Sequence, residues 1–558
     1  MTEKTERFEK LEKSAILARR ADFGVPGARC GRFVLSVFSV FSVFSVRSYA
    51  QQTVPERTNN TTTSRHADVL GFLDSLQRRG AELRVGTLGT SVEGRRIPLV
   101  VVARPQIATP AEAHRSGKPV IWLQANIHAG EVEGKEAVQM LLRDLTLGTL
   151  RPLLDSVVLL VVPIYNTDGN DAFAAAARNR PGQNGPDPVG RRSNGMGLDL
   201  NRDYVKAEAP ETQSAMRLVN EWEPDLFIDL HTTNGSYHGY ALTYAAGNNP
   251  NDSPANAYTR EHFLPEIRER MRKRHRYETF WYGNFRNQTP DSLVQGWETY
   301  DARPRYGVNW IGLRGKVAIL SEAYSNDPFA RRIDATYHFV REILSLAAAE
   351  SSRIRKVVGE SAAARVPIVA VRSRLAPPTE QPVIAELTEP DEDGAGPFAR
   401  RRRTGVMKTI RMPVFDRFEA ARTEKRPVAY LIPPSALNVV QLLRRHGIVV
   451  ERLAAPWRGP AERFKIDSLR AATQPFEGHR DVALEGAWEP ASDRDVAAGF
   501  YLVRTDQPLG TLAAYLLEPA SEDGMVTWNL LDRIVSARGG YPIVRTFVPV
   551  NVERVEIE

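Results

Sequence analysis

Cysteine is almost absent from this chain of 558 residues, because Cys30 is the only one. It precedes an apolar run at residues 33–46 that we expect to be removed from the mature chain. Without a thiol, the mature chain has neither disulfide bridges nor a cysteine nucleophile. Any metal site must therefore use histidine and carboxylate ligands, which is compatible with a catalytic rather than a structural site.

Segregated blocks of charge are scarce as well, although the formal net charge is +7. Lysine, arginine, aspartate and glutamate are interspersed along most of the chain, so we expect no nucleic-acid partner. The exception is residues 400–403, four consecutive arginines that follow an acidic stretch with Gly and Pro. We interpret them as part of a solvated loop, with a contact to an anionic polymer as the alternative.

The sequence also lacks an apolar run of the roughly 20 residues that a membrane-spanning helix needs. The run at residues 33–46 has 14 residues, with a basic stretch before it and the small residues Ser48 and Ala50 after it. This layout is typical of a signal peptide with cleavage near Ala50. We expect an exported protein, periplasmic or extracellular, with no stable membrane span after cleavage. Retention of the run as an anchor is the alternative.

The patterns that are present indicate an α/β protein. Short apolar runs bounded by Gly, Pro, Asn or Asp predict buried strands, and the segments between them have apolar residues at helical spacing. The expected strands are residues 98–103, 120–123, 157–162, 226–230 and 317–320, and the expected helices are residues 67–79, 133–145, 211–222, 258–274 and 333–349. This alternation predicts a sheet with helices on both faces.

The length of the chain predicts two folded units behind the targeting segment. We expect a signal segment at residues 1–50, a polar linker at 51–65, a larger domain at 66–352 and a C-terminal accessory domain at 365–558. Within the accessory domain, strand-like patterns lie at residues 366–371, 428–432 and 500–503, and a helix at 437–446 is followed by Gly447 as its cap and by a further strand at 448–450. The accessory domain is therefore expected to be mixed α/β, and it carries no motif that indicates its role.

Polar residues follow the expected strand at 120–123. His128 and Glu131 are three residues apart at a turn from strand to helix, where both side chains can point to one spot. Alone, this pair is better explained by electrostatics on the surface or at a helix N-terminus. His231 ends the strand at 226–230 at the same kind of edge and completes a set of two histidines and one glutamate. Such a set suits Zn²⁺ and leaves a fourth position open for water.

A third apolar strand, at residues 317–320, runs into Glu322. Beside a divalent cation this carboxylate can act as the general base, which takes a proton from water and passes it to the leaving amine. A salt bridge to an arginine is the structural alternative for Glu322.

The segment between the ligands is rich in arginine, asparagine and glycine. Arg178 and Arg180 lie in one part of it, and Asn201 and Arg202 lie in another. The planar guanidinium of arginine matches a carboxylate, and a second arginine can stabilise an oxyanion on an attacked carbonyl. For each arginine taken singly, a solvated or structural role is equally compatible with the sequence.

Taken together, these segments resemble the M14 zinc carboxypeptidases. The resemblance rests, in order and spacing, on His128-Ala-Gly-Glu131, Asn166-Thr-Asp-Gly169, Leu200-Asn201-Arg202-Asp203, His231 and Glu322, and on the stretch from Thr90 to Ile97. It covers about residues 67–350. The resemblance implies a zinc-carboxypeptidase-like mixed sheet flanked by helices on both faces, with one Zn²⁺ per chain as the cofactor.

The resemblance also implies a role for each residue of the motifs. The zinc ligands would be His128, Glu131 and His231, and Glu322 would activate the attacking water. Asn201 and Arg202 would hold the free carboxylate of a peptide or peptide-like substrate.

Two further roles are less precisely placed by the resemblance. Arg178 or Arg180 would polarise the scissile carbonyl, and Arg180 is favoured because it lies next to a Pro-Gly turn. Tyr306 would be the mobile tyrosine that covers the substrate, with Tyr300 and Tyr324 as alternatives.

The function expected from this resemblance is an exported metallocarboxypeptidase that hydrolyses C-terminal peptide bonds through a metal-activated water. A zinc-dependent amidase or deacylase, or a murein peptidase, on the same scaffold is the alternative. A non-catalytic binding protein is a third possibility, and the intact ligand set together with Glu322 weighs against it.

Overall fold

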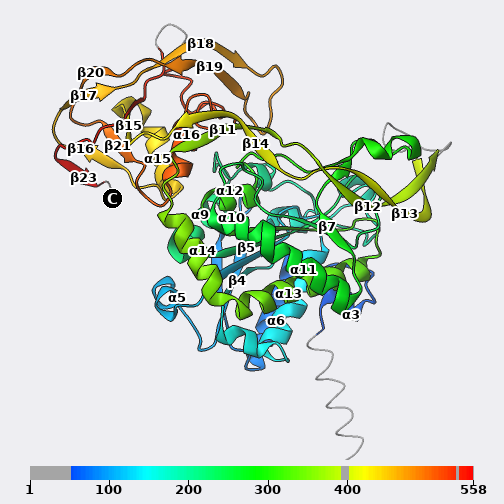
Figure 1. Cartoon of the computed structure of the whole chain (residues 1–558). Helices are drawn as coiled ribbons and strands as arrows, with labels where there is room; N and C mark the ends of the chain where they lie inside the picture. The colour runs from blue at the N-terminus through cyan, green and yellow to red at the C-terminus, as the bar shows by residue number, and fades with distance from the viewer. Residues whose placement is uncertain (1–51, 391–400, 536–539, 557–558) are drawn as a thin grey trace, which may run out of the picture. The chain divides into compact units, whose positions relative to one another are not determined.

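The computed structural model describes residues 52–390, 401–535 and 540–556 (Figure 1). The expected signal run at residues 33–46 and the cleavage site near Ala50 lie outside these residues. Within the described part of the chain, no helix combines the length and the apolar character needed to cross a membrane.

The central sheet has eight strands in the order β1-β2-β4-β3-β5-β10-β6-β7. They are β1 (Leu83–Thr90), β2 (Arg96–Val102), β3 (Val120–Ala125), β4 (Val158–Val162), β5 (Leu226–Thr232), β6 (Leu242–Ala245), β7 (Thr279–Trp281) and β10 (Val317–Ala323). Strands β4, β3, β5 and β10 pair in parallel, whereas β1 with β2, β2 with β4, and β6 with β10 pair antiparallel. The five expected strands are β2, β3, β4, β5 and β10, so the prediction of a mixed sheet is confirmed.

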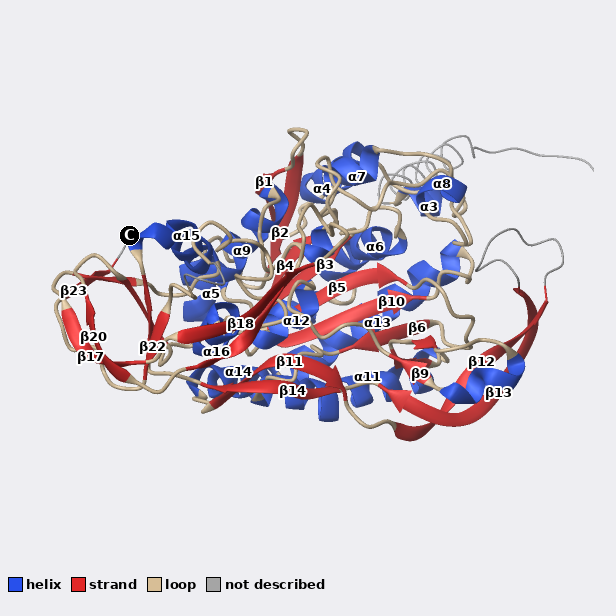
Figure 2. Ribbon diagram, turned by 90° about the horizontal axis from the view of Figure 1, so that it is seen from above, coloured by secondary structure: helices blue, strands red, loops and turns tan. Residues whose placement is uncertain are grey.

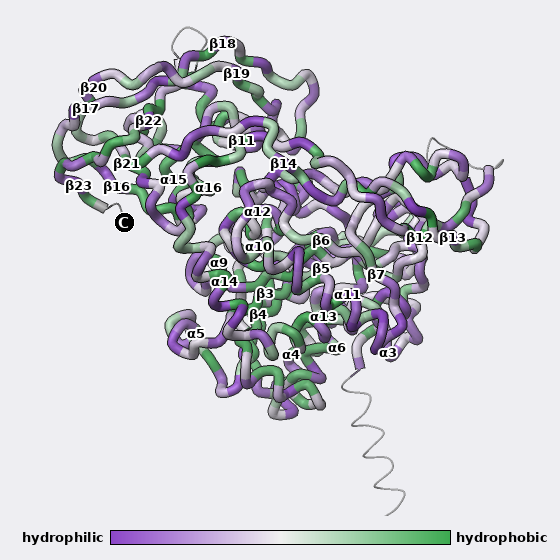
Figure 3. The backbone as a smooth tube through the Cα atoms, viewed as in Figure 1, coloured by the Kyte–Doolittle hydropathy of each residue, from purple (hydrophilic) through white to green (hydrophobic). Residues whose placement is uncertain are grey.

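Helices cover both faces of this sheet because its central strands are apolar on both sides. In β3, Trp122 faces a core that includes Met216 of α9, whereas its neighbour Ile121 faces a second core that includes Leu141 of α6. This alternation follows from the two-residue period of a strand. The covering helices are α4 (His66–Arg78), α6 (Glu133–Thr146), α9 (Pro210–Trp222), α12 (Gly307–Leu313), α13 (Phe329–Ala349) and α14 (Ser351–Ala363). Figure 2 shows the central strands side by side between helices, and Figure 3 shows the apolar character of β3 and β4.

The helix expected at residues 258–274 is a longer and less regular helical segment. Two α-helical parts, α10 (Pro254–Tyr258) and α11 (Leu264–Arg270), alternate with two π-helical turns, η3 (Thr259–Phe263) and η4 (Met271–His275). Pro265 has no N–H to donate to the preceding turn, so the regular α-helical hydrogen bonding is interrupted there.

The C-terminal region is mixed α/β, as expected, and it is rich in strands. A five-stranded sheet has the order β22-β15-β21-β16-β23, with bounds β15 (Ala429–Ile432), β16 (Glu451–Leu453), β21 (Tyr501–Arg504), β22 (Val544–Thr546) and β23 (Arg554–Glu556). A four-stranded sheet has the order β12-β13-β9-β8 and joins β12 (Thr379–Pro390) and β13 (Arg401–Phe415) to β9 (Trp297–Glu298) and β8 (Asn284–Phe285). The remaining strands form pairs, which are β11 (Ile368–Leu375) with β14 (Phe418–Lys425), β17 (Trp457–Ala461) with β20 (Ser492–Val496), and β18 (Phe464–Ala471) with β19 (Val482–Trp488). Helices α15 (Leu437–Arg445) and α16 (Gly510–Leu517) pack in the same region.

The prediction of a strand directly after Gly447 is wrong in the position of that strand. Gly447 follows α15 with a φ of 80°, as predicted for a cap, but β16 begins only at Glu451. The side chain of Gln507 binds both the N–H and the carbonyl of Val449, at 2.8 and 3.1 Å, and so takes the place of a neighbouring strand.

The loop expected at residues 400–403 is wrong for its described part, although Arg402 and Arg403 are exposed to solvent as expected. Residues 401–403 begin β13 and pair with β12, and Arg403 donates to Glu386 at 2.7 Å. Arg400 itself lies outside the described residues.

The described residues, from 52 onward, cluster as one compact unit. The stretch expected as a linker contains helix α3 (Val54–Arg57), and the hydroxyls of Thr63 and Ser64 each donate to the buried carboxylate of Glu136 at 2.7 Å. The boundaries of the two expected domains stay predictions.

Gly134 allows the first turn of α6 to lie directly against β5. A methyl group at this position would lie 2.9 Å from Cβ of Leu230. Gly134→Ala should therefore push α6, and the loop before it, away from the sheet. We expect a lower melting temperature by circular dichroism, equivalent to a destabilisation of about 1–3 kcal/mol.

Gly359→Ala in α14 is the matched control, because nothing lies within 4 Å of the added methyl group. Alanine favours a helix over glycine, so this variant should melt at the wild-type temperature or above it. A Gly134→Ala protein that melts no lower than Gly359→Ala would contradict the close packing of α6.

Candidate active site

The candidate site lies where three parallel strands end side by side. Strands β3, β5 and β10 are neighbours in the sheet, and Glu322 of β10 stands in register with His231 of β5. After β3 ends at Ala125, a short loop carries His128 and Glu131 to the start of α6. The carboxyl ends of parallel strands meet at one edge, which brings together residues that are far apart in the sequence.

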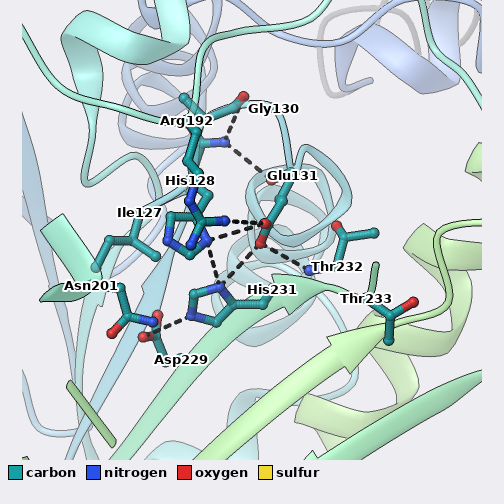
Figure 4. A network of polar contacts seen from close by, with 12 residues as sticks. Ile127, His128, Gly130, Glu131, Arg192, Asn201, Asp229, His231, Thr232 and Thr233 are labelled. Atoms are coloured by element: carbon teal, nitrogen blue, oxygen red, sulfur yellow. Dashed lines mark hydrogen bonds and ion pairs between the residues drawn. The ribbon is translucent and has the colours of Figure 1, made fainter. Parts of the chain in front are cut away.

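His128, Glu131 and His231 face one another at this edge (Figure 4). Their potential ligand atoms all lie within 4.8 Å of one another, and all three side chains are buried. The Nδ1 atom of His128 is 3.1 Å from Oε1 of Glu131, and the Nδ1 atom of His231 is 3.0 Å from Oε2 of Glu131. The two Nδ1 atoms are 3.2 Å apart. The structure therefore brings the three predicted ligands together.

A carboxylate holds the other ring nitrogen of each histidine. Oδ1 of Asp199 is 3.0 Å from Nε2 of His128, and Oδ2 of Asp229 is 3.0 Å from Nε2 of His231. The hydrogen bond to Asp199 places the proton of a neutral His128 ring on Nε2 and leaves a lone pair on Nδ1, and the ion-pair contact with Asp229 favours the same arrangement for His231. Carboxylates in this position orient imidazoles that bind a metal.

The donor set fits a cation. Two nitrogen lone pairs and one carboxylate converge in a buried space, an arrangement that positive charge between them stabilises. Burial disfavours a charged His231, yet Asp229 and Glu131 raise the pKa of His231 well above its usual range. Burial also opposes ionisation of Glu131, but the charges of His128 and Arg180 hold the pKa of Glu131 well below its usual range. Two imidazoles and a carboxylate form a typical catalytic zinc set, so the residues fit one Zn²⁺ per chain.

Glu322 lines the same pocket as the three ligands. Burial raises the pKa of Glu322 to about 8, with His231 lowering it and Glu131 raising it further. A carboxylate that is desolvated in this way is more basic than one in water, which suits a residue that accepts a proton during a reaction.

The pocket also contains the predicted residues Asn201, Arg202 and Tyr306. The side-chain oxygen of Asn201 accepts a hydrogen bond from the N–H of Gly307 at 2.9 Å, which ties the two segments together. The guanidinium of Arg202 lies over the ring of Tyr306, 3.9 Å from its centroid. The other lining residues are Arg192, Thr232, Asn234, Tyr282, Tyr300, Val308 and Leu320.

The two arginines expected to polarise the carbonyl lie outside the lining of this pocket. Arg178 is exposed on the short helix α8 (Ala176–Asn179). Nη2 of Arg180 donates to the carbonyls of Thr232 and Thr233, at 2.5 and 2.8 Å, and Nη1 of Arg180 is 3.3 Å from Oε1 of Glu131. Arg180 therefore supports a ligand and the end of β5, and the roles of both arginines toward a substrate stay predictions.

Arg192 is a pocket residue that the sequence analysis did not select. Its Nε and Nη2 donate to Oδ2 of Asp199 at 3.0 and 2.8 Å. It lies in a loop without periodicity, so only its closeness in sequence to the motif around Asp199 could have indicated it. Tyr282 also lines the pocket and was not selected from the sequence. Tyr324, one of the alternatives for the mobile tyrosine, lies outside the pocket lining, and its hydroxyl accepts a hydrogen bond from the N–H of His238 at 3.3 Å.

Comparisons with known proteins give matches in sequence and in structure. Residues 69–303 match the zinc carboxypeptidase family. "Carboxypeptidase 2" of Trichophyton tonsurans is 24% identical over 523 residues, which cover 88% of this chain and 89% of that protein. "Carboxypeptidase E" of Caenorhabditis elegans is 35% identical over 123 residues, 21% of this chain and 24% of that protein. The crystal structure of carboxypeptidase A from Helicoverpa armigera gives a TM-score of 0.38 at 15% identity, over 63% of this chain and 97% of that chain.

The range that matches the family contains all three ligands. The alignment with the Trichophyton protein covers 88% of this chain, so it also extends into the region after residue 365. Residues 69–303 therefore form a domain that matches the M14 zinc carboxypeptidases, and together with the ligand set this match identifies the protein as a zinc metallopeptidase.

Proposed function

We propose that the chain is an exported carboxypeptidase that removes the last residue from peptides with a free C-terminal carboxylate. The observation that carries this proposal is a single pocket in which the zinc ligands, Glu322 and the pair Asn201 and Arg202 converge. The zinc ligands and the base are the groups needed for a water molecule to attack an amide carbonyl. A guanidinium beside them favours substrates that carry a carboxylate near the scissile bond.

His128, Glu131 and His231 would hold a Zn²⁺ ion, which would supply Lewis-acid chemistry for the scissile carbonyl and the attacking water. Glu322 takes the proton from this water and passes it to the leaving amine. The burial that raises the pKa of Glu322 helps with the first of these steps, because a more basic carboxylate accepts a proton more readily.

Arg202 and Asn201 bind the C-terminal carboxylate of the substrate. Nη1 of Arg202 donates to the carbonyl of Asn201 at 2.7 Å, and the ring of Tyr306 supports the face of the guanidinium. These contacts hold the guanidinium in place, so less side-chain freedom is lost when a carboxylate binds to its remaining N–H groups.

Glu322→Gln keeps the size of the side chain and removes the base. We expect kcat for release of the last residue to fall at least about a hundredfold, while metal analysis still finds one zinc per chain. Glu360→Gln, on the exposed face of α14, is the matched control and should keep wild-type kcat. Wild-type turnover by Glu322→Gln would exclude this residue as the base.

Arg202→Gln should lower kcat/KM for a free-ended peptide about 10- to 100-fold, because a hydrogen bond to a charged group contributes roughly 1.5–3 kcal/mol. The amidated form of the same peptide should be a poor substrate for both proteins, so the variant narrows the difference between the two peptides. Arg217→Gln, on the exposed face of α9, should behave as wild type.

If the wild-type protein cleaves the amidated peptide as fast as the free-ended one, the substrate proposal fails. Release of acyl groups or of muropeptide fragments in the same assays would then identify an amidase or a murein peptidase that uses the same zinc site.

The export part of the proposal is supported by the apolar run at residues 33–46 and by Ser48 and Ala50 after it. N-terminal sequencing of the mature protein is expected to begin at Gln51, because the small residues predict cleavage after Ala50. A protein that keeps this segment and stays in the cytoplasm would contradict export without affecting the assignment of the zinc site.

A further inference from the structure

A tight turn of the C-terminal region reaches the zinc site. Between β18 and β19, Phe476 and His479 exchange backbone hydrogen bonds at 2.7 and 2.9 Å. The two residues between them, Glu477 and Gly478, have φ values of 48° and 83°. Two positive φ values in a two-residue turn are characteristic of a type I′ turn.

Glu477 is an unusual residue for its position in this turn. Asn, Asp and Gly are the residues that readily adopt a left-handed conformation, and a longer side chain such as glutamate is disfavoured there. A non-glycine residue held in this conformation is a reason to ask what its side chain does. Its carboxylate oxygen Oε2 accepts a hydrogen bond from the backbone N–H of Asp199 at 2.9 Å.

Asp199 is the residue through which Glu477 reaches the metal ligands. Oδ1 of Asp199 lies 3.0 Å from Nε2 of His128, and Oδ2 accepts two hydrogen bonds from Arg192. The same Oδ1 accepts from the N–H of Asn201 at 2.9 Å. A shift of the Asp199 backbone would therefore move a zinc ligand, a pocket arginine and the start of the Asn201 segment together.

Contacts on both sides fix the position of the turn. Nε2 of His479 is 2.9 Å from Oε1 of Glu208, and Nδ1 of His479 is 3.1 Å from Oδ1 of Asn529. Further along the hairpin, Asp481 accepts from the buried Arg305 at 3.2 Å. Arg305 precedes the pocket residue Tyr306 in the chain. The turn is thus attached to the segments that form the pocket, and it does not depend on Glu477 alone for its place.

We propose that Glu477 is a positioning residue of the zinc site, supplied by the C-terminal region. It holds the backbone of Asp199 so that the Asp199 carboxylate keeps the imidazole of His128 turned toward the metal and keeps Arg192 in the pocket. This inference rests on the zinc site of the proposed function, and it does not depend on which amide is the substrate. Through Glu477, the C-terminal region would help to position the residues that bind the metal.

The experiment is to measure the zinc affinity of the full-length mature protein, by competition with a chelator, in variants of residue 477. Glu477→Asn suits the left-handed backbone but is one methylene shorter, so it removes the contact without straining the turn. We expect the melting temperature to be equal or higher, and zinc to bind about tenfold more weakly, the lower end of the effect of residues around metal ligands. Glu477→Gly, which also tolerates positive φ, should show the same loss of affinity.

Two further variants separate the contact from its surroundings. Glu477→Gln keeps an oxygen acceptor at the same length and should restore zinc affinity to near the wild-type value. Gln474→Ala, in the exposed segment just before the turn, should bind zinc as wild type does. Asp199→Ala should weaken zinc binding at least as much as Glu477→Asn, because Glu477 acts through Asp199.

Wild-type zinc affinity in both Glu477→Asn and Glu477→Gly would overturn the proposal, and so would a loss of affinity in Glu477→Gln equal to that in Glu477→Asn. These outcomes are read from metal binding. They stay distinct from a failure of the carboxypeptidase proposal, which would appear as missing turnover of free-ended peptides by protein that binds zinc normally.

Discussion

Parallel pairing of β3, β5 and β10 fixes where three distant segments of the chain end. Since these strands are buried on both faces, most of their side chains are apolar, and the polar side chains that face the site lie toward their carboxyl ends. His231 and Glu322 stand in register at this edge, and the loop after β3 brings His128 and Glu131 to it. The metal centre is thus a consequence of sheet topology, and any change that moves β5 relative to its neighbours would separate the ligands.

Two further carboxylates orient the histidines so that they can bind one metal ion. Asp199 and Asp229 hold the outer nitrogen of each imidazole, so that the inner nitrogens face the same point. Arg180 and Arg192 lie close to Glu131 and balance the negative charge that four carboxylates would otherwise concentrate there. The contact between Glu477 and Asp199 extends this network of contacts into the C-terminal region, so the region after residue 365 is physically connected to the metal centre.

The sheet and the three ligands could be predicted from the sequence because their signals are local. An apolar run such as residues 226–230 predicts a strand, and His231 directly after it marks the strand end. Arg192 and Tyr282 could not be found in this way, since they lie in irregular segments whose course is set by tertiary contacts such as the pairing of Arg192 with Asp199. The prediction of a strand directly after Gly447 was wrong for the same reason. The side chain of Gln507, about sixty residues away in sequence, forms hydrogen bonds with the backbone N–H and carbonyl of Val449.

The central claim is that His128, Glu131 and His231 hold one zinc ion between them. Anomalous diffraction from a crystal of the mature protein, recorded on both sides of the zinc absorption edge, tests it most directly. The account predicts one zinc peak per chain at about 2.0–2.2 Å from Nδ1 of both histidines and from the carboxylate of Glu131. A peak held by other residues, or crystals grown with zinc that show no peak at these three side chains, would contradict it.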